Sequence, residues 1–106
     1  MKHFDPKQLS EHIENSETKP FLLDVREPWE FDICHIENSV SLPMALIPER
    51  LNELDNQQEL VVICHHGIRS RQVAMYLEGN GFSNVINLTG GVAAWAQEID
   101  KNMSQY

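Results

Sequence analysis

The sequence predicts an α/β fold in which a sheet carries helices on both faces. Short apolar runs typical of strands buried on both sides occur at 21–25, 60–63 and 85–88. Between and after them, apolar residues return every three or four positions, as they do on the inner face of a helix. Because strands and helices alternate along the chain, we expect a parallel sheet joined by right-handed crossovers.

Length and charge limit the kinds of partner. The 106 residues are enough for one modest core, so we expect a single domain over residues 1–106. No apolar run is long enough to cross a bilayer and no signal peptide is evident, which predicts a cytoplasmic protein without a membrane partner. The formal net charge of −8 repels nucleic acids, so a small anionic substrate needs local cations such as Arg69 and Arg71.

The first helix is predicted to begin at Pro6. Asp5 is suited to cap it, proline is favoured at its first position, and Gln8 completes a capping box. Leu9 and Ile13 then fall on the inner face of this helix. A polar surface connection is expected to lead from it to the first apolar run.

The apolar run at 21–25 contains one acid, Asp24. A buried acid at this position is expected to bind backbone groups or an arginine. Arg26 and Glu30 lie four residues apart in the sequence that follows. We therefore expect these two side chains to pair on a helical turn.

Three further segments are expected before the second apolar run. Residues 27–33 are typical of a short helix, with Trp29 and Ile33 packed in the core. Residues 39–43 alternate polar with apolar and end on a proline, which favours a short edge strand. Residues 47–54 carry apolar side chains at helical spacing, which predicts another helix.

Cys64 follows the run at 60–63, and a helix is predicted at 70–77. In open α/β sheets, ligands bind at the carboxyl ends of strands, where a helix amino terminus offers free N–H groups. This position and the nearby Arg69 favour the thiolate, the nucleophilic form of a cysteine. Gly67 lets the loop turn so that its N–H groups converge on the sulfur or on an anion bound to it.

The remaining chain predicts one strand and one helix. Glycines at 79–81 are expected to end the preceding helix, and 85–88 forms the last strand. A tight turn at 89–91 then leads into the final helix. The inner face of that helix is formed by Val92, Trp95, Ala96 and Ile99.

Other interpretations of the loop are weaker. His65 and His66 form a dense cluster with Cys64, but adjacent residues do not easily converge on one ion, so neither a metal nor another cofactor is expected. The two histidines are instead expected to be exposed. Cys34 is expected to be a small packed residue, and the alternative is a second redox cysteine that resolves an oxidised Cys64.

Three groups of residues resemble the signatures of a known family. They are Leu23–Arg26 with Glu30–Phe31, Cys34–Ile36 and Leu42–Pro43, then Cys64–Ser70, and last Leu88–Trp95. In this order they are similar to the motifs of the rhodaneses, in particular the small single-domain sulfurtransferases. The resemblance implies a rhodanese-like fold with a central parallel sheet of five strands. At Cys34 the family typically has glycine, although a cysteine there resembles rhodanese domains attached to ubiquitin-like activating enzymes.

The resemblance also implies a reaction. Cys64 would take a sulfane sulfur from a donor such as thiosulfate, become a persulfide and pass the sulfur to cyanide or a thiol. Arg69 would hold the sulfonate of the donor, and the backbone N–H groups of the loop would stabilise the persulfide. The other loop residues of this substrate site are His65, His66, Gly67, Ile68 and Ser70. The alternative is a sulfur-relay or regulatory module that acts on a protein thiol and turns over little thiosulfate.

Loop length separates this reaction from that of related enzymes. Cys64 to Arg69 spans six residues, as in the sulfurtransferases. The phosphatases and arsenate reductases that this fold also resembles have one residue more, which makes room for a tetrahedral oxyanion. The sequence therefore predicts a loop sized for a persulfide rather than for a phosphate, and Arg71 lies too far along the chain to change that.

Overall fold

The computed structural model describes all 106 residues and contains one parallel sheet with the strand order β1-β5-β4-β2-β3. The strands are β1 (Lys2–Phe4), β2 (Phe21–Asp24), β3 (Val40–Ser41), β4 (Leu60–Ile63) and β5 (Val85–Leu88). The helices are α1 (Pro6–Asn15), α2 (Pro28–Ile33), α3 (Ile68–Gly79) and α4 (Gly91–Glu98). The predicted α/β fold with five parallel strands is confirmed. None of the helices has the length and apolar character needed to span a membrane.

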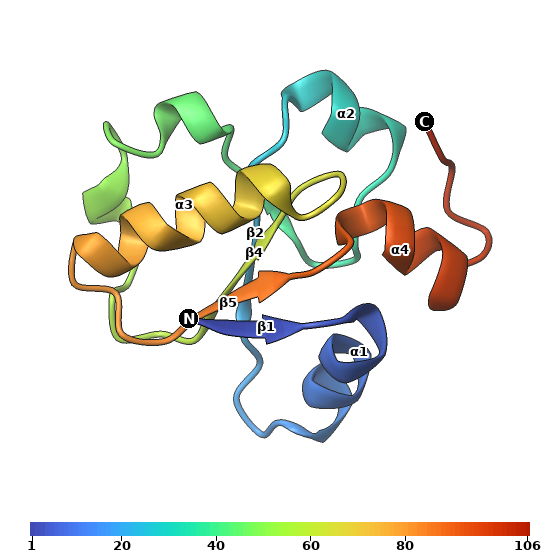
Figure 1. Cartoon of the computed structure of the whole chain (residues 1–106), viewed down its shortest axis with the longest axis horizontal. Coiled ribbons are helices and arrows are strands. Elements are labelled where there is room, and N and C mark those ends of the chain that lie inside the picture. The colour runs from blue at the N-terminus through green and yellow to red at the C-terminus, as the bar shows by residue number, and fades with distance from the viewer.

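The sheet separates two apolar layers because successive side chains of a strand point to opposite faces. In the central strand β4, Leu60 and Val62 pack in one layer with residues of α3. Val61 and Ile63 pack in the other layer with residues of α1 and α4. Figure 1 shows α3 on one side of the strands and α1 with α4 on the other. Helices therefore cover both faces of the sheet, and the last residue of β4, Ile63, is fully buried.

The start of α1 forms as predicted. The Asp5 carboxylate accepts a hydrogen bond from the Gln8 backbone N–H at 2.8 Å, and the Gln8 side chain accepts one from the Asp5 N–H at 2.9 Å. This reciprocal pair is a capping box with Pro6 at the first helical position. Leu9 is fully buried, and Ile13 packs against the same layer.

Two parts of the expected fold differ. The helix expected over 47–54 is wrong: this region holds a turn and one 3-10 helix, η2 (Leu51–Glu53), and another 3-10 helix, η1 (Met44–Leu46), ends just before it. Pro48 lies between them and has no N–H to donate to a continuous helix. Strand β1 has no counterpart among the predicted runs, because it is short, mostly exposed and formed by pairing with the distant β5.

Helix α2 buries an acid rather than its aromatic residue. Glu30 is 4% exposed and is the buried residue of this helix, whereas Trp29 is 60% and Ile33 40% exposed. The expected core positions of Trp29 and Ile33 are therefore wrong. The inner side of α2 faces charged groups rather than an apolar layer, so the periodicity of its apolar residues does not mark the buried face.

Helix α4 begins against the loop that follows β4. The N–H of Val92 donates to the carbonyl oxygen of Cys64 at 2.9 Å, and the N–H of Ala93 donates to that of His65 at 3.1 Å. Gly91 lies at the contact with a φ of +57°, and a Cβ there would be 2.4 Å from both carbonyl oxygens. The two backbones can approach this closely only because residue 91 has no side chain.

We expect Gly91→Ala to lower the free energy of unfolding by about 2 kcal/mol or more, because the new methyl group clashes with backbone and the φ is unfavourable. Gly79→Ala is the matched control: a Cβ at Gly79 would meet nothing within 4 Å and the residue lies in a helix, so stability should stay equal or rise by up to about 1 kcal/mol. Urea unfolding measures both. Equal changes for the two variants would contradict the proposed close approach.

Candidate active site

Cys64 lies at the carboxyl end of β4, where the loop to α3 begins. The residue is 1% exposed. The loop ends at Gly67, which has a φ of +95° and immediately precedes the first residue of α3, Ile68. A left-handed residue at this position reverses the chain so that the helix amino terminus is directed back at the cysteine. The strand, the turn and the helix are therefore placed as the sequence predicts.

The sulfur of Cys64 has two polar neighbours. The backbone N–H of Gly67 donates to Sγ at 3.0 Å, and Sγ lies 3.4 Å from the hydroxyl oxygen of Ser70. Ser70 in turn donates to Oδ1 of Asn87 at 2.5 Å. Both Ser70 and Asn87 are buried. The sulfur is thus held by one backbone donor and a short polar chain that leads to β5.

Asn87 is a site residue that none of the sequence motifs described above contains. It is the one polar residue of strand β5, as Asp24 is of β2. A buried polar residue in an otherwise apolar strand needs hydrogen-bond partners, so its presence is a signal that points to a nearby polar site. Its partner Ser70 lies 17 residues away in sequence, and spacing alone does not indicate the pair.

Arg69 makes a two-pronged ion pair with Glu30. Its two terminal nitrogens donate to the two carboxylate oxygens of Glu30 at 2.7 and 2.9 Å. The hydrogen bonds from Arg69 hold the pKa of Glu30 at about 2, and those bonds also raise the pKa of Arg69. The expected pairing of Arg26 with Glu30 is therefore wrong, because the Glu30 carboxylate binds Arg69 of α3 instead.

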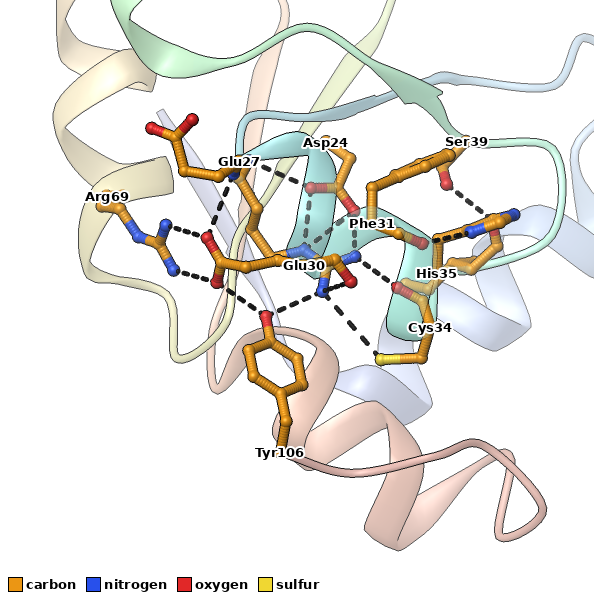
Figure 2. Close-up of polar contacts among 11 residues, drawn as sticks. Asp24, Glu27, Glu30, Phe31, Cys34, His35, Ser39, Arg69 and Tyr106 are labelled. Carbon is orange, nitrogen blue, oxygen red and sulfur yellow. Dashed lines mark hydrogen bonds and ion pairs between the residues drawn. The ribbon is translucent and has the colours of Figure 1, made fainter.

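Arg26 instead pairs with Asp24 in a fully buried contact. Its Nη2 donates to Oδ2 of Asp24 at 2.7 Å, and the Asp24 carboxylate also accepts the backbone N–H of Arg26 at 3.1 Å. The expectation that Asp24 binds an arginine or backbone groups is confirmed. Figure 2 shows the Asp24 carboxylate near the Glu30–Arg69 pair.

Tyr106 joins the two ion pairs, and Figure 2 shows its hydroxyl pointing to Glu30. Its hydroxyl accepts from Nη1 of Arg26 at 2.8 Å and donates to Oε2 of Glu30 at 2.7 Å. Its ring stacks on His65 with centroids 4.0 Å apart and meets Trp29 edge-on at 5.9 Å. Burial raises the pKa of Tyr106 to about 12, so the hydroxyl keeps the proton that it donates to Glu30. Nothing in the sequence marks this residue, whose partners lie far away along the chain.

The two histidines of the loop differ in their surroundings. His65 is partly buried between Tyr106 and His66, with ring centroids 4.0 Å from each, so the expectation that it is exposed is wrong. His66 is exposed as predicted. Burial lowers the pKa of His65, so its ring is neutral at neutral pH. Among the His, Cys, Asp and Glu side chains, no group of three or more is arranged to hold a metal ion.

Cys34 lies outside the hydrogen-bond chain of Cys64. It is partly buried, and its sulfur is 4.0 Å from Nη1 of Arg26. With His65, His66 and Tyr106 it lines a cavity of about 160 Å³ beside the loop. Of the predicted site residues, the structure thus gathers Cys64, Gly67 and Ser70 around the sulfur, turns Arg69 toward Glu30, and leaves the side chains of His66 and Ile68 exposed.

The pKa of Glu30 predicts a specific loss of stability in acid. Because it is about 2 in the folded chain and 4.5 ordinarily, the carboxylate stabilises the fold fully above pH 4.5 and progressively less as the pH falls toward 2. The Glu30→Gln variant lacks this contribution, on the order of 3 kcal/mol, so its unfolding free energy should fall less over that window. Glu27→Gln, an exposed change on the same turn, should follow the wild type. Parallel curves for the wild type and Glu30→Gln would contradict the ion pair.

Known proteins match this chain closely. The profile of the rhodanese-like domain family matches residues 5–98. A sulfurtransferase of Allochromatium vinosum is 38% identical over 93 residues, which cover 88% of this chain and 86% of that protein. The thiosulfate sulfurtransferase GlpE of Pseudomonas syringae pv. syringae is 43% identical over 74 residues, 70% of each chain. The crystal structure of a rhodanese-like domain protein from Staphylococcus aureus has a TM-score of 0.84 at 32% identity and covers 93% of this chain and 95% of that one. These matches show that the protein belongs to the rhodanese-like family, as its three motifs predict.

Proposed function

We propose that this rhodanese-like protein is a sulfurtransferase in which Cys64 carries a sulfane sulfur as a persulfide. The observation that supports it most is the position of the Cys64 sulfur, which lies at a strand end and accepts the Gly67 N–H at 3.0 Å. The segment from Cys64 to Arg69, which contains the turn and the first two residues of α3, is six residues long. Such a site stabilises a sulfur anion through backbone donors that are already in place.

The reaction has two displacement steps. In the first, the Cys64 thiolate attacks the outer sulfur of a donor such as thiosulfate, the S–S bond of the donor breaks, and sulfite leaves with the bonding electrons. In the second, cyanide or a thiolate attacks the outer sulfur of the persulfide, and the Cys64 thiolate leaves. No external oxidant or reductant is needed. The covalent intermediate predicts ping-pong kinetics.

The loop is assigned the task of stabilising the persulfide. The backbone N–H groups from His65 to Ser70 belong to the turn and the first residues of α3, so they lack partners within the helix. Together with the helix dipole they favour a negative charge at the sulfur. The hydrogen bonds from α4 to the carbonyls of Cys64 and His65 support this role, because they orient the opposite side of the same peptide groups.

A second candidate function is delivery of the sulfur to a protein thiol. It is favoured by two large apolar side chains that stay exposed at the site, Trp29 at 60% and Ile68 at 70%. Trp29 contacts Tyr106, and Ile68 is the first residue of α3. Exposed apolar residues beside a reactive group favour contact with another protein. Persulfide transfer to a protein cysteine with negligible thiocyanate formation would distinguish this function from small-molecule turnover.

We expect Cys64→Ser to abolish thiocyanate formation from thiosulfate and cyanide, because the alcohol is not ionised at neutral pH and forms no persulfide. Mass spectrometry of the donor-treated wild type should find one added sulfur on the peptide that contains Cys64. Cys34→Ser is the matched control and should retain both the added sulfur and the turnover. Activity that survives in Cys64→Ser would refute the assignment.

A further inference from the structure

The arginine of the active-site loop is already neutralised by an acid. Both terminal nitrogens of Arg69 are bound to the Glu30 carboxylate, at 2.7 and 2.9 Å. Glu30 is 4% exposed, and its carboxylate also accepts the Tyr106 hydroxyl and the Glu27 backbone N–H. These two bonds use two of the five N–H groups of the guanidinium, occupy its end-on fork and balance its positive charge. A donor therefore meets an ion pair here rather than a free cation.

The other charges near the loop do not replace this cation. Arg26 is fully buried and paired with Asp24 at 2.7 Å. Burial lowers the pKa of His65, next to the nucleophile, which disfavours a positive charge on its ring. Arg71 makes no ion pair. It lines a cavity of about 300 Å³ together with His3 and loop residues such as Gly67, and Cys64 does not line that cavity.

We propose that Glu30 sets the charge of the sulfur donor, so that the site favours donors with a single negative charge, such as thiosulfonates, over the dianion thiosulfate. This rests on the proposed persulfide chemistry of Cys64. The backbone N–H groups of the loop supply partial positive charge enough for one sulfur anion. A second negative charge on the donor needs a cation that is not already balanced, and Glu30 removes the one that Arg69 offers.

The comparison uses two donors of different charge, thiosulfate and methanethiosulfonate, which also differ in their leaving groups. In thiosulfate the outer sulfur is bound to an SO3 group, and attack by the Cys64 thiolate releases sulfite. In methanethiosulfonate a methyl group replaces one oxygen anion, and the same attack releases methanesulfinate. In both cases one S–S bond forms as another breaks, and the leaving group takes the electron pair. The intrinsic reactivity of each donor is the same for every variant. The change between variants in the ratio of kcat/KM for thiosulfate to that for methanethiosulfonate therefore measures the effect of the site on the second negative charge.

The test is steady-state kinetics of the wild type and Glu30→Gln with cyanide as acceptor and each donor in turn. The wild type should prefer methanethiosulfonate, and Glu30→Gln should raise the ratio for thiosulfate about tenfold, because Arg69 loses its balancing charge. Glu27→Gln makes the same change in net charge on the exposed side of the same helical turn. Its ratio should match the wild type to within about twofold, because water screens exposed charges.

The double variant Glu30→Gln with Arg69→Gln covers the case in which the single variant folds poorly. It removes both charges at once, so its ratio should return close to that of the wild type. A double variant that selectively loses thiosulfate activity would show that Arg69 holds the sulfonate in spite of Glu30, and this would overturn the inference. So would a ratio that Glu30→Gln leaves unchanged while methanethiosulfonate still places a sulfur on Cys64. If neither donor places a sulfur on Cys64 in the wild type, the proposed function itself fails.

Discussion

The hydrogen bonds from the start of α4 to the carbonyl oxygens of Cys64 and His65 are the constraint on which the site depends. A peptide group whose carbonyl points outward to a neighbouring helix presents its N–H to the other side, toward the inside of the loop. The left-handed turn at Gly67 completes this arrangement by directing α3 back at the sulfur. Because Gly91 has no side chain, the two segments can meet without a clash, and the loop is shaped before any substrate binds.

Two ion pairs lie beside the loop, one fully buried and the other with a partly exposed arginine, Arg69. Asp24 balances the charge of Arg26, and Glu30 balances that of Arg69. The Tyr106 hydroxyl connects the two pairs. Removing one partner of such a pair leaves a charge that the interior solvates poorly, so these residues are expected to act as a unit. Because each pair is neutral overall, neither Arg26 nor Arg69 is an unpaired cation beside the Cys64 sulfur.

Local patterns predicted the parts of the molecule that depend on neighbouring residues. The capping box of α1, the strand that ends at Cys64 and the loop at Gly67 each follow from a few adjacent residues. Contacts between distant elements could not be predicted in this way. Glu30 and Arg69 are 39 residues apart, and helical periodicity placed Trp29 rather than Glu30 inside because it assumes an apolar interior. Spacing gives no signal for the role of a residue as distant as Tyr106.

The most direct test of persulfide formation in this loop is a crystal structure of the protein after reaction with a sulfane-sulfur donor and removal of the excess. We expect one additional sulfur bonded to Sγ of Cys64, within hydrogen-bond distance of backbone N–H groups of the loop, with the Glu30–Arg69 pair still formed. A sulfur bonded to Cys34 instead, or an added sulfur on Cys64 that points away from the loop N–H groups, would contradict the proposed role of the loop.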